Sequence, residues 1–136
     1  MAVLYNLKKS PLFTVDERIS LLKSEISDIP GVQVESYNGL LTEFAKLRGV
    51  KYILRGVRNG DDCPYEIAMA QANRELNKDI ETIILVTDPN YGYISAGLIR
   101  EIAEIGYTAP LGSFDDKVLD KWVSPAVKKM LNNKYR

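Results

Sequence analysis

The sequence contains no histidine and a single cysteine, Cys63, and both shortages exclude classes of chemistry. Without an imidazole, this chain of 136 residues offers no histidine base, nucleophile or metal ligand of its own. One cysteine cannot form an intramolecular disulfide, and together with the lack of histidine it excludes a structural zinc site. A nearly cysteine-free chain fits a reducing compartment, and we predict a cytoplasmic protein.

An excess of charge of either sign is also missing, because Lys plus Arg and Asp plus Glu both number 18. A net charge of zero argues against a general binder of nucleic acids or anionic membranes. No run approaches the roughly 20 apolar residues of a membrane span, and no charged-then-apolar signal segment opens the chain. We therefore predict neither a nucleic-acid partner nor a membrane partner.

What the sequence does contain is a regular alternation of short apolar runs with amphipathic stretches. The apolar runs predict strands at Ala2–Tyr5, Val32–Ser36, Val50–Leu54 and Ile80–Thr87. The amphipathic stretches predict helices after Thr14, over Gly39–Arg48, Tyr65–Leu76 and Ala96–Ile105, and in a tail over about 115–136. Such alternation builds βαβ units and a mostly parallel sheet. Since no linker or repeat divides the chain, we predict a single α/β domain over residues 1–136.

Several residues mark the expected helix ends. Thr14 and Glu17 have the spacing of a capping box, and Ser95 is a plausible N-cap. Gly49 is placed to cap the helix over Gly39–Arg48, and Gly106 to end the helix that begins at Ala96. The apolar residues that we expect to face inward in the helix over 39–48 are Leu40, Leu41, Phe44, Ala45 and Leu47.

Parallel α/β sheets bind ligands at the carboxyl ends of their strands, and this rule selects four segments. They are Asn6–Ser10, Ser36–Leu41, Arg55–Asp62 and Thr87–Gly97. In the first segment, Lys8 and Lys9 can meet an anion or can belong to a solvated loop.

The most specific of these segments begins with Arg55–Arg58. Arginine forks bind phosphate oxygens bidentately, and Gly56 permits a close approach of the backbone. The two arginines could equally form a structural ion-pair cluster with Asp61 and Asp62. Both interpretations stay open at this point.

Further along the chain, Glu66 lies in the first turn of its predicted helix, where the helix dipole favours a carboxylate. It could also contact a ribose or an adenine. The stretch Tyr91–Gly97 opens a helix and can bind an anion through backbone N–H groups, although a simple N-cap explains Ser95 equally well. We expect Tyr37, Tyr65, Tyr91 and Tyr93 to be packing residues. Together the segments suggest a phosphate-rich small ligand over the strand ends.

Several longer motifs run in order from about residue 3 to residue 130. They are KKSPLFTVDER at 8–18, VESYNGLLTEFA at 34–45, ILRGVR at 53–58, DCPYE at 62–66, MAQANREL at 69–76, ETIILV at 81–86, ISAGLIREIA at 94–103 and VSPAV at 123–127. In this combination they resemble the motifs of the bacterial phosphopantetheine adenylyltransferases, a family of nucleotidyltransferases. The resemblance covers nearly the whole chain.

This resemblance implies a Rossmann-like parallel sheet with flanking helices and an enzyme of coenzyme A biosynthesis. In the family, the phosphate of 4′-phosphopantetheine attacks ATP directly and receives AMP, and Mg²⁺ accompanies ATP; the sequence shows no evident protein ligands for the metal. The resemblance implies catalytic roles for Lys9 and Arg58, and substrate contacts for Lys9, Leu41 and Arg55. The ATP contacts that it implies are Gly56, Val57, Arg58, Glu66, Tyr91, Gly92, Tyr93, Ile94, Ser95, Ala96 and Gly97.

The chain also departs from the family pattern. Family members begin with a strand and a Gly-(Ser/Thr)-Phe-Asp-Pro…Gly-His segment, which this sequence lacks, and the family's Ile-Ser-Ser-Ser is replaced by Ile94-Ser95-Ala96-Gly97. The family's first strand is central, so we expect a gap in the sheet. The remaining strands could pair directly, or another chain could donate a strand. Alternatively, this sequence could be the larger part of a protein whose first segment, a complementing N-terminal segment, is not included in it.

Two other functions stay open beside the enzyme. One is a non-catalytic relative that binds a nucleotide or coenzyme A and acts as a regulator or interaction protein. The other is an assembly subunit, because the family forms symmetric oligomers. We accordingly predict a homo-oligomer.

Overall fold

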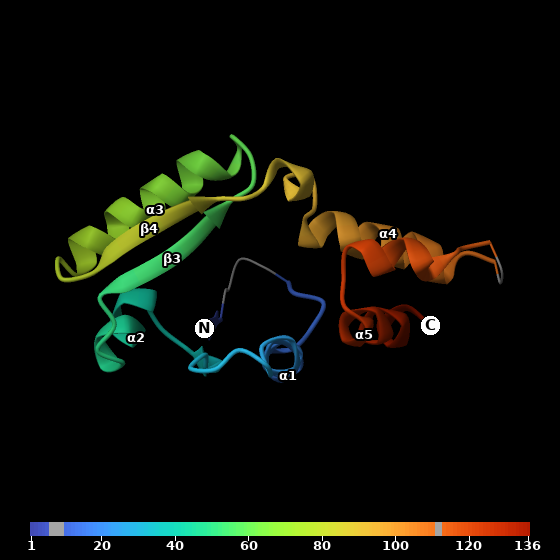
Figure 1. Ribbon diagram of the computed structural model, residues 1–136, viewed down its shortest axis with the longest axis horizontal. Helices are drawn as coiled ribbons and strands as arrows, with labels where there is room; N and C mark the ends of the chain where they lie inside the picture. Colours follow the sequence, from blue (N-terminus) through green and yellow to red (C-terminus); the bar gives the residue numbers. More distant parts are fainter. Residues whose placement is uncertain (6–9, 111–112) are drawn as a thin grey trace. The chain divides into compact units, whose positions relative to one another are not determined.

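The computed structural model describes residues 1–5, 10–110 and 113–136, and the contacts within it divide the chain into two compact units. Unit 1 comprises Met1–Ser36 and Ile94–Arg136, and unit 2 comprises Tyr37–Tyr93. Strands and helices alternate along the chain as predicted, and the class is mixed α/β with parallel strands and flanking helices (Figure 1). The single domain over residues 1–136 stays a prediction.

The helices and strands of both units follow one another in a fixed order along the chain. In that order they are β1 (Ala2–Leu4), α1 (Val15–Glu25), β2 (Glu35–Tyr37), α2 (Leu41–Leu47), β3 (Tyr52–Val57), α3 (Asp62–Leu76), β4 (Glu81–Val86), the 3₁₀ helix η1 (Pro89–Tyr91), α4 (Ala96–Thr108), the 3₁₀ helix η2 (Asp116–Lys121) and α5 (Pro125–Tyr135). The described strands form two two-stranded sheets, one of β1 with β2 and one of β3 with β4.

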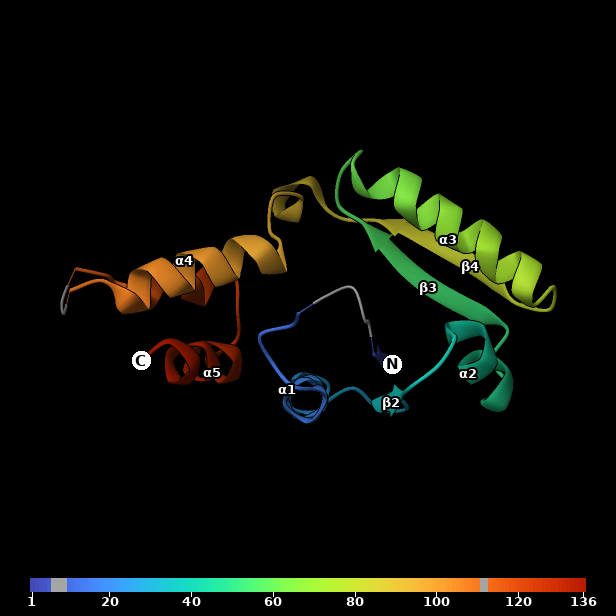
Figure 2. The same cartoon turned by 180° about the vertical axis from the view of Figure 1, so that it is seen from behind.

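Unit 2 is built on the parallel pair of β3 and β4, in which Ile53 lies opposite Thr82 and Val57 opposite Val86. Both views show α3 running along this pair (Figures 1 and 2). The buried residues Ala45, Ile53 and Ile80 form a small apolar core. Because the two strands are parallel, their carboxyl ends meet at one edge of the sheet, which the chain leaves through the segments after Val57 and Val86.

The face of β3 and β4 that points away from α3 is apolar and exposed. Side chains alternate between the two faces of a strand, and Arg55 and Thr82 are bonded to residues of α3. The opposite face, which we call the open face, therefore carries four apolar or aromatic side chains that are each at least 41% exposed. They are Tyr52, Leu54, Ile83 and Leu85.

Unit 1 has a larger core, formed between α4, η2 and α5. The buried residues Ile99, Ala103 and Tyr107 are spaced four apart along α4, so they line one face of that helix. They pack with Leu119 of η2 and Leu131 of α5. Figure 2 shows α4 and α5 side by side.

The local capping signals are confirmed. The Thr14 hydroxyl accepts a hydrogen bond from the Glu17 N–H at 3.2 Å, and the Glu17 carboxylate accepts one from the Thr14 N–H at 2.8 Å. Gly49 follows α2 with a φ of +63°, which is the left-handed conformation of a helix C-terminus. Ser95 caps α4 by accepting a hydrogen bond from the Leu98 N–H at 3.1 Å.

The prediction that Gly106 ends its helix is wrong. The helix α4 continues through Gly106 to Thr108. A Cβ atom at position 106 would lie 2.5 Å from the ring of Phe114, which packs edge-on against Tyr107. The glycine therefore provides space for an aromatic ring and is not a helix stop.

Several element boundaries also differ from the predictions. The strand predicted at Val50–Leu54 runs over Tyr52–Val57, because hydrogen bonds to β4 continue past Leu54. The strand predicted at Val32–Ser36 is the shorter Glu35–Tyr37. In α2, Ala45 is buried, but Leu40 and Leu47 are 50% and 70% exposed and do not face inward.

Candidate functional site

Arg55, which lies near the carboxyl end of β3, is paired with a buried carboxylate. Its Nε and Nη2 atoms donate hydrogen bonds of 2.7 and 2.6 Å to the two oxygens of Glu66. Glu66 is only 8% exposed and lies in the second turn of α3, not in the first turn as predicted, because α3 begins at Asp62. The hydrogen bonds to Glu66 raise the pKa of Arg55, against the opposing effect of burial.

Arg58 follows β3 and makes a second bidentate pair. Its Nε and Nη2 donate to the two oxygens of Asp62 at 2.9 and 3.0 Å, and its backbone N–H donates to the same carboxylate at 3.1 Å. The hydrogen bond from Arg58 lowers the pKa of Asp62, and the same contact raises the pKa of Arg58. Both side chains are partly exposed.

The ion-pair interpretation is therefore confirmed for Arg58 with Asp62, whereas Arg55 has a partner that was not predicted. Sequence reasoning offered Asp61 and Asp62, whereas the structure pairs Arg58 with Asp62 and Arg55 with Glu66. A guanidinium has five N–H donors and a bidentate contact uses two, so the pairs are compatible with a phosphate contact. The spacing of Asp62 and Glu66, four residues apart, places both carboxylates on one face of α3.

The ends of β3 and β4 bring two of the predicted ATP segments together. A Cβ atom at Gly92 would lie 3.2 Å from the backbone oxygen of Arg58, so the turn after η1 passes close to the end of β3. Beside Gly56 a Cβ would meet no atom within 4 Å, which leaves open space next to the backbone there. Val57 is buried at the end of β3.

The tyrosines of this region differ in how far they are packed against other side chains. Tyr37 stacks on Phe44 with the ring centroids 5.0 Å apart, as expected of a packing residue. The same expectation is wrong for Tyr65, Tyr91 and Tyr93, which are 59%, 59% and 60% exposed. Leu41 begins α2 and packs, partly buried, against the core of unit 2.

The remaining predicted contacts belong to unit 1. Ser95 caps α4, Ile94 packs against the core of this unit, and Ala96 and Gly97 form the first residues of the helix. Gly97 lines a pocket of about 490 Å³ together with Ser10, Pro11, Leu12, Arg100, Glu101, Glu104, Ile105 and Tyr135. Arg100 donates hydrogen bonds to the backbone oxygens of Ala96 and Ser10. Lys8 and Lys9 lie outside the described residues.

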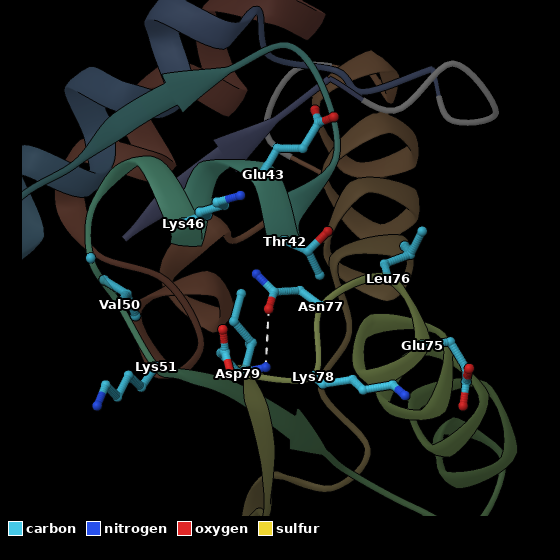
Figure 3. A pocket seen from close by; sticks show the side chains of 12 residues that line it. Thr42, Glu43, Lys46, Val50, Lys51, Glu75, Leu76, Asn77, Lys78 and Asp79 are labelled. Atoms are coloured by element: carbon cyan, nitrogen blue, oxygen red, sulfur yellow. Dashed lines mark hydrogen bonds between the residues drawn. The ribbon is translucent and has the colours of Figure 1, made fainter.

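A pocket of about 550 Å³ lies at the other end of the strands of unit 2 (Figure 3). It is formed by α2, the C-terminus of α3 and the first residues of the turn into β4, with the buried Thr42 on its wall. Within the described part of the chain, none of the predicted site residues lines it. Since ligands of parallel sheets bind at the carboxyl ends of the strands, we assign the candidate site to the arginine end.

Two features are absent from the described residues. No group of three or more His, Cys, Asp or Glu side chains there could hold a metal ion. No helix in the same residues has the length and apolar character needed to cross a membrane.

Comparison with known proteins agrees with the fold. The family model described as cytidylyltransferase-like matches residues 3–102, and the chain therefore belongs to the cytidylyltransferase-like family. Within that class, the chain is similar to proteins named phosphopantetheine adenylyltransferase.

Three of these relatives show how far the similarity extends. The one from Caldanaerobacter subterraneus subsp. tengcongensis is 48% identical over 106 residues, which are 78% of this chain and 66% of the relative. The one from Lachnoclostridium phytofermentans is 42% identical over 78% of this chain and 65% of the relative. The one from Staphylococcus carnosus is 38% identical over 89% and 74%. The chain thus spans about two thirds of the length of the first two.

The family resemblance seen in the motifs is confirmed by these relatives. Because they carry the name of an enzyme, they do not favour the alternative of a non-catalytic regulator. The motifs predicted a ligand role for each arginine but none for Asp62. The spacing of Arg58 and Asp62, four residues apart, is the signal that could have drawn attention to this pair.

Proposed function

We propose that this chain forms the major part of a phosphopantetheine adenylyltransferase, which transfers AMP from ATP to 4′-phosphopantetheine. The observation that carries the proposal is the 38–48% identity to proteins of that name over most of the chain. The two bidentate arginine pairs at the end of β3 support it, because this is where a phosphate-rich ligand of a parallel sheet would bind.

The reaction needs no covalent enzyme intermediate. An oxygen of the substrate phosphate forms a bond to the α-phosphorus of ATP, and the bond from that phosphorus to the bridging oxygen breaks. Pyrophosphate leaves with the electron pair and carries the developing negative charge. Catalysis then consists of positioning and charge neutralisation, for which Arg58 and Lys9 provide cations.

The other residues divide between the two substrates. We assign Arg55, Leu41 and Lys9 to the phosphopantetheine side. We assign Gly56–Arg58, Glu66 and Tyr91–Gly97 to ATP. The open space beside Gly56 supports a close approach of the triphosphate to the backbone.

The remaining partners follow from this reaction. We propose that Mg²⁺ arrives bound to ATP, held by phosphate oxygens, because the described residues offer no cluster of carboxylates for it. A cytoplasmic location and a homo-oligomeric state stay predictions. Since the given sequence has no histidine, we propose that full activity needs the family's Gly-His segment in addition to these residues.

The test is pyrophosphate release from ATP, Mg²⁺ and 4′-phosphopantetheine, measured with the chain alone and with a peptide carrying the family's first strand and Gly-His segment. We expect turnover on mixing and little or none from either part alone. A peptide with its histidine replaced by alanine should restore much less activity. Mixing that restores no activity, with the chain shown folded by circular dichroism, would refute the proposal.

A matched pair of variants tests the assigned end of the sheet. Arg58→Ala should lower turnover of the mixture by at least about tenfold, since one charge-assisted phosphate contact is lost. Arg74→Ala removes the same charge from the other end of α3, where Arg74 pairs with Glu81 at the surface. It should leave turnover within about twofold, because exposed ion pairs contribute little.

A further inference from the structure

We propose that Asp62 is a positioning residue, which holds the guanidinium of Arg58 in one orientation for a polyphosphate ligand at the end of β3. The inference rests on the proposed function, since the triphosphate of ATP is the polyphosphate concerned. Asp62 itself contacts the arginine and not the ligand.

The geometry of the pair fixes both the side chain and the backbone of Arg58. One oxygen of Asp62 accepts hydrogen bonds from Nε and from the backbone N–H, at 2.9 and 3.1 Å, and the other accepts from Nη2 at 3.0 Å. Two parallel bonds to a planar guanidinium fix its plane as well as its position. The third bond ties the same carboxylate to the chain at the point where it leaves β3.

The carboxylate is itself held on a rigid element. Asp62 is the first residue of α3, which has 15 residues, and its N–H donates to the side chain of Asn59 at 3.3 Å. The preceding residue, Asp61, donates its N–H to the same oxygen at 3.1 Å. The turn over residues 59–62 therefore fixes the start of the helix and, with it, the Asp62 side chain.

The pair is also placed where a ligand can reach it. The side chains of Arg58 and Asp62 are 38% and 25% exposed, in contrast to the 10% of Glu66 in the neighbouring pair. Exposed ion pairs contribute little to the stability of a fold. The pair of Arg58 and Asp62 therefore serves to orient Arg58 rather than to stabilise the fold.

Because Asp62 is negatively charged, its removal should change ligand affinity in opposite directions depending on whether it repels the ligand or positions Arg58. A carboxylate next to a polyphosphate repels it, so removing that charge should by itself strengthen binding. Removing a positioning group should weaken binding, because the arginine then loses conformational entropy when the ligand arrives. Weaker binding after loss of a negative charge therefore identifies the positioning role.

The experiment compares Asp62→Asn with Asp61→Asn in the full chain, using calorimetry with ATP and with inorganic tripolyphosphate. Asp61 carries the same charge one residue away, and its side chain caps nothing in α3. We expect Asp62→Asn to weaken binding of both ligands about tenfold, the contribution of one well-oriented charge-assisted contact. Asp61→Asn should leave affinity unchanged or slightly higher. Asp62→Glu keeps the charge but moves the carboxylate, and should also weaken binding.

A second measurement follows Arg58 without any ligand. In ¹⁵N spectra, the Nε resonance of Arg58 should be sharp and protected from exchange in the parent chain and in Asp61→Asn, and should lose that protection in Asp62→Asn. A merely structural role would lower the melting temperature and leave the affinity for tripolyphosphate unchanged. Unchanged affinity in Asp62→Asn, equal weakening in both asparagine variants, or an unaffected Nε resonance would each overturn the inference.

Failure of the proposed function gives a different result. If the chain binds tripolyphosphate but not ATP, the adenylyl-transfer proposal fails, while weaker tripolyphosphate binding by Asp62→Asn still supports the positioning role. If the parent chain binds neither ligand, the positioning role fails as well.

Discussion

Glu66 is a carboxylate that unit 2 keeps almost entirely from water, with both oxygens bonded to Arg55. Burying an ion is costly unless hydrogen bonds replace those of water, so this residue depends on its partner. We expect Glu66→Gln to lower the free energy of unfolding by about 1–3 kcal/mol, the usual cost of weakening a hydrogen bond between charged groups. Urea denaturation at neutral pH measures this difference.

The control for this residue is Glu75→Gln on the same helix. Glu75 is exposed and makes no ion pair within the described part of the chain, so its replacement should change stability by less than about 0.5 kcal/mol. Equal losses in both variants would show that helix charge, and not the pair with Arg55, is responsible.

Among the elements, α4 gives a prediction that opposes helix propensity. In the interior of an exposed helix, replacement of glycine by alanine usually stabilises the helix by about 1 kcal/mol. In α4 the new methyl group of Gly106→Ala would meet the ring of Phe114 at 2.5 Å, so we expect a net loss of about 1–3 kcal/mol instead. Gly97→Ala is the matched substitution in the same helix, where the nearest atom would be 3.6 Å away, and it should be neutral or stabilising in ligand-free protein. Thermal melting of both variants checks the opposite signs.

The contact between η2 and α5 predicts a dependence on pH. The Lys128 Nζ atom lies 3.0 Å from Oδ1 of Asp116 and 2.8 Å from Oδ1 of Asp120. The hydrogen bond from Lys128 lowers the pKa of Asp116. A carboxyl group with a lowered pKa stabilises the fold above its unfolded pKa, and that stabilisation is lost as the pH falls through the folded pKa. Asp116→Asn should therefore lower the melting temperature at neutral pH and have no effect in strong acid. A difference that does not change with pH would contradict this assignment.

At the scale of the whole molecule, the open face of β3 and β4 should make the chain associate with itself. Large exposed apolar faces and free sheet edges favour contacts between copies. We expect Leu85→Lys, which places a charge on a side chain 57% exposed on this face, to shift the chain toward smaller species in analytical ultracentrifugation. Ile29→Lys adds the same charge in unit 1 at a side chain 52% exposed, and should leave the distribution unchanged.

Features that depend on near neighbours in the chain could be predicted from spacing. The capping box of Thr14 and Glu17, the cap at Ser95 and the left-handed Gly49 each involve residues no more than four positions apart. Local hydrogen bonds and backbone conformations of this kind are readable from spacing alone. The alternation of apolar runs with amphipathic stretches predicted parallel strands, which β3 and β4 are, and the motif order predicted the family.

Contacts between residues far apart in the chain depend on how the elements pack. Arg55 bonds Glu66, eleven positions along the chain, and Gly106 makes room for Phe114, so neither role appears in a local pattern. The exposure of Leu47 and the boundaries of β3 depend in the same way on what packs beside them. Burial and pairing are properties of the folded neighbourhood, because side chains compete for partners only after the elements have come together.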